Sequence, residues 1–324
     1  MFMAESSYKK LLEVSRIVGL PIKKILDILY YLGSGKRILN NNLLQTVGVS
    51  RNVLNQVKQQ LEEFFIQKSQ FTVLSNQATT IAKKILGESY TPEEKLINIS
   101  LAKNTQLLSL ISHSQPQPIR GYDQFLADSE TVVKRAALMD FFADIEGKRI
   151  LFLGDDDFTS VAIAFYRKAQ TITVVDIDKK ILDGIQEISD SSSYQITTKP
   201  YDAREKLSPE LSGKYDIVFT DPPYTREGIS LFLSRAVQAL DPTNQAGRIY
   251  FCYGNSDRAK ERYLPIYEVI ISSGLMIRWV FDKFNRYSGA ESIGSASSLF
   301  ICDVTPKTKP KITGEYKGNI YTER

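Results

Sequence analysis

Hydrophobic residues recur at helical spacing through the first third of the chain. Apolar positions over residues 11–18 repeat with the period of a helix, and a second stretch of the same kind follows Pro21. Similar patterns start near Asn76 and at Thr91, and the last of these extends to about Ile111. The first segment is therefore predicted to be mainly helical.

A glycine turn between two of these helices is typical of helix-turn-helix domains. A short helix ends at Gly48, and Ser50 can cap the next helix, which carries apolar residues through Leu61. Two apolar stretches that follow, near residues 65 and 72, could form a small wing. We predict a winged-helix-like domain over residues 1–111. Because the capped helix carries only two basic side chains, we expect it to serve dimerisation or lid formation rather than DNA binding.

From residue 112 onward, short apolar strands alternate with helices. Strands that are apolar throughout are buried on both faces, which indicates a mostly parallel sheet with helices on both sides. We predict an α/β, Rossmann-like, doubly wound sheet over residues 112–305. A flexible basic tail over residues 306–324 follows, with a lid over the site as the alternative. The expected strands are 149–153, 171–175, 215–220, 248–253, 276–281 and 298–304, and a helix is expected at 257–273.

Composition narrows the chemistry. One histidine and two cysteines in 324 residues exclude a disulfide framework, a cysteine-based zinc site and a two-histidine metal site. No apolar stretch approaches the roughly 20 residues of a membrane span, and no secretory signal is visible. We therefore expect a reducing, cytoplasmic setting and no membrane partner. Residues 1–111 carry a net charge of +6, residues 112–305 a net −5 and the tail a net +3, which suggests different partners for different parts of the chain.

Polar residues stand where the expected strands end, which is where ligands bind in such sheets. Asp176 ends the second strand, 22 residues after Gly154 ends the first. At that spacing a carboxylate can accept hydrogen bonds from ribose hydroxyls, although it could also only cap the next helix. Asp202 and Ala203 follow a third strand-like stretch, where the carboxylate can accept from an adenine amino group and a backbone N–H can face the ring. These residues predict a nucleoside site.

Three carboxylates, Asp155, Asp156 and Asp157, fill the turn where a dinucleotide site carries glycines. They would repel a pyrophosphate or a ligand carboxylate, which disfavours NAD, ATP and ordinary S-adenosylmethionine. They favour a ligand that ends in a bare ammonium, although an acidic triplet can also be a solvated helix start. No tightly bound cofactor and no metal are expected.

A second motif, Asp221-Pro222-Pro223-Tyr224 followed by Thr225, has the form with which amino-methyltransferases receive a target amine. The two prolines stiffen the turn. The carboxylate and the neighbouring carbonyls can accept hydrogen bonds from the amine, and the aromatic face can stack on a base or a cation.

The two motifs together resemble the branched-chain polyamine synthases, the N(4)-bis(aminopropyl)spermidine synthases of thermophiles. The stretch Tyr122-Asp123-Gln124 and the helix start at Ser129 are similar to that family as well. The resemblance covers about residues 112–305, and the family places a small winged-helix-like domain first. It implies a methyltransferase-like sheet and transfer of aminopropyl groups from decarboxylated S-adenosylmethionine to the secondary amine of spermidine, with release of methylthioadenosine.

Roles for individual residues follow from the motifs and this resemblance. The polyamine is the expected partner, a homodimer is compatible with the sequence, and nucleic acid is not expected to bind. The open alternatives are an S-adenosylmethionine-dependent amino-methyltransferase of DNA or RNA, and a winged-helix regulator that senses a nucleoside or a polyamine. The candidate catalytic residues are Asp156, Asp157 and Asp221; the candidates for binding the donor are Gly154, Asp155, Asp176, Asp202 and Ala203; those for binding the polyamine are Tyr122, Asp123, Pro222, Pro223, Tyr224 and Thr225.

Overall fold

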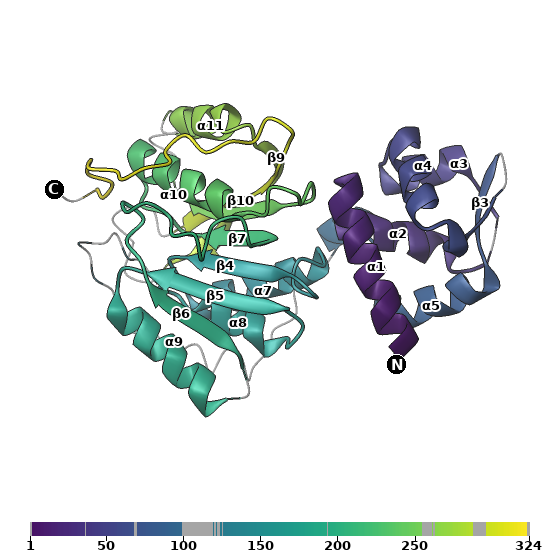
Figure 1. Cartoon of the computed structure of the whole chain (residues 1–324), viewed down its shortest axis with the longest axis horizontal. Coiled ribbons are helices and arrows are strands. Elements are labelled where there is room, and N and C mark those ends of the chain that lie inside the picture. The colour runs from purple at the N-terminus through teal and green to yellow at the C-terminus, as the bar shows by residue number, and fades with distance from the viewer. Residues whose placement is uncertain are drawn as a thin grey trace. The chain divides into compact units, whose positions relative to one another are not determined.

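The chain forms two compact units in the computed structural model. One unit comprises Met1–Ser100 with Phe141–Asp144 and Thr243–Ala246, and the other comprises Leu101–Asp140, Ile145–Pro242 and Gly247–Arg324. Figure 1 shows the main segment of the first unit, Met1–Ser100, in purple and blue, and the second unit in teal to yellow. The structure describes residues 2–35, 37–67, 70–98, 119, 121, 124, 126–192, 194–254, 261, 263–287 and 296–322.

The first unit packs helices around a small antiparallel sheet with the strand order β1-β3-β2. Gly48 ends α3 in the left-handed conformation, at φ 70°, which glycine adopts without strain. The Ser50 hydroxyl then accepts a hydrogen bond from the Val53 N–H and caps α4. The elements are α1 (Phe2–Val18), α2 (Ile22–Leu32), β1 (Ile38–Leu39), α3 (Asn40–Val47), α4 (Arg51–Gln60), η1 (Glu62–Phe64), β2 (Phe65–Gln67), β3 (Phe71–Leu74) and α5 (Asn76–Leu86).

The α-helix predicted from Thr91 is wrong over its described part. A 3-10 helix, η2 (Glu93–Asn98), stands there instead. The backbone N–H of Glu93 donates to the buried Asp27 carboxylate at 3.2 Å, so a tertiary contact holds the start of this segment. The remainder of the predicted helix, and the single histidine, lie outside the described residues.

The second unit is built on a seven-stranded sheet with the order β6-β5-β4-β7-β8-β10-β9. Five strands run parallel, and β10 pairs antiparallel with both β8 and β9, which confirms the mostly parallel α/β sheet. The strands are β4 (Arg149–Leu153), β5 (Thr171–Asp176), β6 (Ile196–Pro200), β7 (Ile217–Thr220), β8 (Arg248–Tyr253), β9 (Met276–Arg286) and β10 (Ala296–Asp303).

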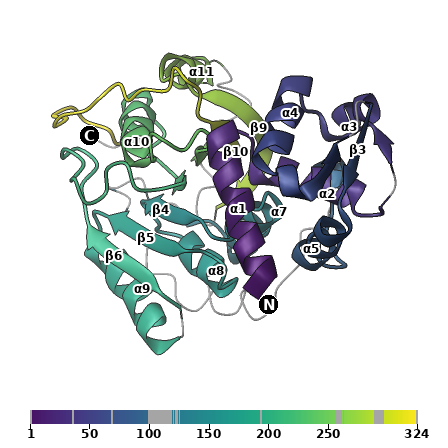
Figure 2. The same ribbon diagram turned by 45° about the vertical axis from the view of Figure 1, so that its right-hand side comes forward.

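Helices bury both faces of this sheet. α10 (Arg226–Ala239) and α11 (Tyr263–Ser272) contact one another, and so do α8 (Thr159–Phe165) and α9 (Lys179–Ser191). Figure 1 shows the first pair toward the top of this unit and the second toward the bottom, and Figure 2 shows the same unit turned. Alternate residues of β4 point to the two faces of the sheet. Leu151 and Leu153 join the core beside α10, while Phe152 points to the opposite face and its ring contacts the Phe219 ring of β7 in a tilted arrangement. All of these side chains are buried, as the apolar strands predicted.

The strand order places a switch point between β4 and β7. From β4 the chain winds outward through β5 and β6, and it then returns to the other side of β4 to form β7 and β8. In open α/β sheets, ligands bind at the carboxyl ends of the strands at such a point. The turns after β4 and β7 carry the two sequence motifs, so the fold brings both motifs to this crevice.

The segment after Thr305, predicted to be a flexible tail, is instead packed along α10. The buried guanidinium of Arg235 donates to the carbonyls of Ile312 and Gly314, at 3.2 and 2.6 Å. Ile320 is buried beside Leu231 and Ala203. The prediction relied on the basic charge of the segment and did not take account of its apolar side chains, which pack against the rest of the unit.

Candidate functional site

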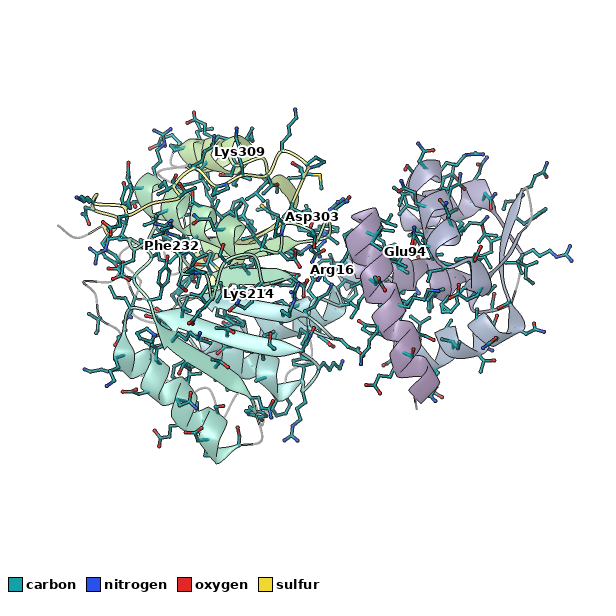
Figure 3. The ribbon with its side chains drawn as sticks, in the orientation of Figure 1. Arg16, Glu94, Lys214, Phe232, Asp303 and Lys309 are labelled. Carbon is teal, nitrogen blue, oxygen red and sulfur yellow. The ribbon has the colours of Figure 1, made fainter. Side chains whose placement is uncertain are left out.

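A pocket opens at the switch point. Acidic and apolar side chains share its wall, and no lysine or arginine is among the described residues that line it. Phe232, labelled in Figure 3, reaches the pocket from α10, and Tyr321 reaches it from the C-terminal segment. The lining residues are Gln124, Leu153, Gly154, Asp155, Asp156, Val175, Asp176, Ile177, Tyr201, Asp202, Ala203, Asp221, Pro223, Phe232 and Tyr321.

The turn after β4 gives each of its three carboxylates a different environment. Gly154 takes φ +77°, a left-handed conformation that lets the chain turn sharply at the end of the strand. Asp155 is buried, and its carboxylate accepts from the Ser160 N–H at 3.1 Å in the first turn of α8. Burial, with the charge of Asp157 nearby, raises the pKa of Asp155 well above its ordinary value.

Asp157 does not line the pocket. Its carboxylate pairs with Arg135 of α7 (Ser129–Phe141), whose side chain is also fully buried, and accepts from the Thr159 hydroxyl at 2.8 Å. This carboxylate is therefore held by a cation and a hydroxyl, on the side of the turn away from the pocket. The expectation that it handles substrate directly finds no support in this geometry.

Asp156 lies between these two and faces the pocket. Among the described residues its side chain has no hydrogen-bond or ion-pair partner, and four other carboxylates surround it. Burial and, next, the charge of Asp157 raise the pKa of Asp156 well above its ordinary value. No hydrogen bond or ion pair in the described part of the chain offsets that rise, so a cation placed here would find an acceptor already in position.

Asp221 approaches the same pocket from the turn after β7. One of its carboxylate oxygens accepts from Tyr287 at 2.7 Å and from Arg135 at 3.1 Å, and the other accepts from Tyr224 at 3.1 Å. Burial raises the pKa of Asp221, while Arg135 and the two tyrosine hydroxyls act in the opposite direction. Three donors fix the orientation of this carboxylate and weaken it as a proton acceptor relative to Asp156.

Two further acids line the far part of the pocket. Asp176 accepts from the backbone N–H groups of Asp155 and Asp178, at 3.0 and 2.8 Å, so it braces the turn after β4 as well as facing the pocket. Asp202 is held by Arg204, whose Nε and NH2 both donate to it, and this pairing lowers the pKa of Asp202. Beside them, Ala203, Phe232 and Tyr321 provide apolar surface that a flat ring could contact.

The remaining predicted residues fall in different places. Pro222 and Pro223 are buried in the turn, and only Pro223 lines the pocket. Tyr224 lies behind the pocket with its hydroxyl on Asp221, and its ring rests against Gly254, where an added Cβ would come within 2.5 Å of it. Thr225 caps α10 and donates to the Ile320 carbonyl, which makes it a structural residue. Tyr122 and Asp123 lie outside the described residues.

Sequence reasoning missed several residues of the site. Arg135 sits mid-helix, and no motif marks it as the cation that faces two acidic turns. Tyr287, Asn285 and Ser297 come from the antiparallel end of the sheet and complete the polar network around Asp221. Buried polar residues on strands β9 and β10 were the available signal, because buried polar groups require partners.

The described part of the chain lacks two other kinds of functional feature. No group of three or more His, Cys, Asp and Glu side chains could hold a metal ion there. No helix there has the length and apolar character needed to cross a membrane.

Residues 104–320, more than half of the chain, match the family described as the branched-chain polyamine synthase A C-terminal domain. An uncharacterized protein of Methanocaldococcus jannaschii is 40% identical over 200 residues, which are 62% of this chain and 49% of that protein. The N(4)-bis(aminopropyl)spermidine synthase of Thermococcus kodakarensis is 33% identical over 179 residues, 55% of this chain and 50% of that enzyme. The chain therefore spans about half the length of the curated relatives it matches.

A solved structure shows the same fold. The branched-chain polyamine synthase of Thermus thermophilus, in complex with N4-aminopropylspermidine and 5'-methylthioadenosine, aligns with a TM-score of 0.61 and 18% identity. The alignment covers 97% of this chain and 98% of that one. At this identity the likeness establishes the α/β, methyltransferase-like architecture.

Proposed function

Because the chain belongs to the family of the branched-chain polyamine synthase A C-terminal domain, we propose that it is an aminopropyltransferase. It takes aminopropyl groups from decarboxylated S-adenosylmethionine and adds them to the secondary amine of spermidine, which gives branched polyamines and methylthioadenosine. The observation that carries the proposal is the carboxylate of Asp156, which has no partner among the described residues and lies in a pocket with four other acids and no described cationic side chain on its wall.

The pocket suits the donor. We assign Asp176 to the ribose hydroxyls, and the surface formed by Ala203, Phe232 and Tyr321 to the adenine ring, with Asp202 at its edge, because all of them line the pocket. The aminopropyl ammonium would then lie near Asp155 and Asp156. A donor that kept its carboxylate would bring a negative charge to these acids, which argues against the amino-methyltransferase alternative.

The acids also suit the acceptor and the chemistry. The spermidine nitrogen attacks the methylene carbon attached to the sulfonium, the new C–N bond forms, and the C–S electron pair stays on sulfur to leave neutral methylthioadenosine. The attacking nitrogen must lose one proton, and we assign its acceptance to Asp156, because no donor in the described structure competes for that carboxylate. Asp221, with its orientation fixed by three donors, holds the polyamine ammonium that flanks the attacking nitrogen.

The remaining assignments concern the rest of the chain. The order α2, β1, α3, α4, β2 and β3, with a capped α4 after a glycine turn, supports a winged-helix-like domain in the first unit. We assign it to interactions between protein chains, including a homodimer, because the exposed face of α4 carries amides and only one arginine, Arg51. A polyamine remains the proposed small-molecule partner.

Mass spectrometry tests the proposal directly. The purified chain is incubated with decarboxylated S-adenosylmethionine and spermidine, and the products are fragmented to locate the added group. We expect methylthioadenosine together with a polyamine branched at the secondary amine, and at least a hundredfold slower formation by Asp156→Asn, the scale of losing a general base. Wild-type protein that releases no methylthioadenosine, or that extends only the terminal amine, would overturn the proposal.

A further inference from the structure

Arg135 occupies an unusual position for a charged residue. Its side chain is completely buried in the middle of α7, with the guanidinium carbon 5.3 Å from the centre of the Phe219 ring on β7. A buried charge is unfavourable unless it is paired and hydrogen-bonded, so a guanidinium in this place requires partners on every side.

Every N–H group of this guanidinium has an acceptor. Nε donates to the Asn285 side-chain oxygen at 2.8 Å. One terminal nitrogen donates to Asp157 and to the Thr159 hydroxyl, and the other donates to Asp221 and to the Tyr287 hydroxyl. Arginine carries five N–H donors in a planar fork, and all five are used here.

These partners come from separate parts of the sheet. Asp157 and Thr159 belong to the turn after β4 and the start of α8, Asp221 to the turn after β7, and Asn285 and Tyr287 to the antiparallel end. The two turns are those that border the pocket. Arg135 therefore connects both acidic motifs from behind, without lining the pocket.

We propose that Arg135 is a positioning residue for the transfer reaction. Its guanidinium fixes the two acidic turns relative to each other and holds Asp157 away from the pocket, so that Asp156 faces the substrate. The inference rests on the proposed function. Without the guanidinium, Asp157 and Asp221 would be two buried carboxylates with no cation between them, and the turns that carry them would move apart. A displacement of about 1 Å between reacting groups is enough to cost a hundredfold in rate.

The charge state of Asp221 provides a readout that a purely structural role would not move. Among the described residues, the groups that face it are Arg135, Asp156, Asp157, Tyr224, Tyr287 and Cys252, and Arg135 is the only cation in this set. Removing that cation raises the pKa of Asp221 further. The acidic limb of the rate profile should then move to higher pH.

The test compares pH profiles of turnover for four proteins. Arg135→Met should lose about a hundredfold in turnover and shift its acidic limb upward. Arg135→Lys keeps the charge but offers three donors in place of five, so it should lose about tenfold while its limb stays in place. Lys134→Met is the matched control, because Lys134 lies next to Arg135 on α7 and pairs only with Glu130 at 3.4 Å in the described structure. It should behave as wild type.

The double variant Arg135→Met with Asp157→Asn removes one buried cation together with one buried anion. It should recover part of the turnover and bring the acidic limb back toward wild type. Full turnover in Arg135→Lys, or an unshifted limb in Arg135→Met, would overturn the proposal. If Arg135→Met does not fold, the pH profiles of turnover for Arg135→Lys and for the double variant test the proposal in its place.

A failure of the proposed function is separable from a failure of this inference. If the wild type transfers no aminopropyl group, the melting temperature still reports on Arg135. A carboxyl whose pKa is raised in the folded state lowers stability as pH rises from its unfolded value of about 3.9 toward the folded one. The deficit of Arg135→Met relative to wild type should therefore be larger at pH 8 than at pH 5. An equal deficit at both values would contradict the role given to Arg135.

Discussion

Replacing Asp156 by asparagine should make the unliganded protein more stable. The substitution keeps the size and shape of the side chain and removes only its charge. Asp156 faces four like charges, those of Asp157, Asp221, Asp176 and Asp155, and it has no partner in the described structure. While no cation is bound, the repulsion among these carboxylates lowers the stability of the folded protein. A neutral asparagine at position 156 removes part of that repulsion.

The size of this stabilisation depends on pH. Burial and neighbouring anions raise the pKa of Asp156, so the folded state binds its proton more tightly than the unfolded state does. Stability contributed by this group falls as pH rises from about 3.9, the unfolded value, through the raised folded value. The asparagine variant should therefore gain most at pH 8 and least at pH 4. Relief of such repulsion typically contributes about 0.5–2 kcal/mol, which for a unit of this size raises the melting temperature by roughly 1–8 °C.

Spermidine should stabilise the variant less than it stabilises the wild type. At a concentration of 100 times its dissociation constant, a ligand stabilises the folded state by about 2.7 kcal/mol. If the loss of the Asp156 carboxylate weakens spermidine binding tenfold, the same spermidine concentration stabilises the variant by only about 1.4 kcal/mol. The variant should thus start with a higher melting temperature and respond to spermidine about half as strongly.

Scanning calorimetry at pH 5 and pH 8, with and without spermidine, measures both effects. Asp183→Asn is the matched control, since it makes the same chemical change at an exposed position on α9 and should alter neither value. An unliganded Asp156→Asn protein that melts below wild type at pH 8 would refute the argument. So would a spermidine response as large as that of the wild type.

Two further predictions concern packing around the site. Gly254→Ala places a methyl group within 2.5 Å of the Tyr224 ring, so we expect a loss of about 1–3 kcal/mol in unfolding free energy. Transfer should also be slower, because the displaced tyrosine loses the hydrogen bond from its hydroxyl to Asp221. Kinetics equal to those of the wild type would contradict this prediction. Arg235→Met removes a donor from three backbone carbonyls, of which the Ile312 carbonyl keeps a second donor in the described structure, the Gln238 amide. Urea unfolding should show a loss of about 1–3 kcal/mol that does not change between pH 5 and pH 8, because no carboxylate is involved.

Sequence reasoning reached the fold of the second unit because its evidence is local. Wholly apolar strands separated by helices specify a parallel sheet, and the acids that follow strands must then lie at one edge. Asp155, Asp156, Asp176 and Asp221 accordingly line one pocket. The same reasoning could not distinguish the three members of the acidic triplet, because their differences arise from partners that are distant in sequence.

The parts that sequence reasoning missed depend on tertiary contacts. Arg135 meets Asp221 across 86 positions, and no local spacing records such a pairing. The C-terminal segment appeared flexible because its lysines dominate the composition, whereas Ile312 and Ile320 decide its placement by packing beside Leu231 and Phe232. The helix predicted from Thr91 followed propensity, which the contact between Glu93 and Asp27 overrides.

Isothermal titration calorimetry with two donors tests the central claim most directly. S-adenosylmethionine and its decarboxylated form differ by one carboxylate, and the account places that carboxylate beside Asp155 and Asp156, where no cationic side chain lines the described pocket wall. The decarboxylated donor should bind at least about tenfold more tightly, a difference of about 1.4 kcal/mol, and Asp156→Asn should narrow the gap. Equal affinity for the two donors in the wild-type protein would contradict the claim that this acidic pocket selects a cationic aminopropyl donor.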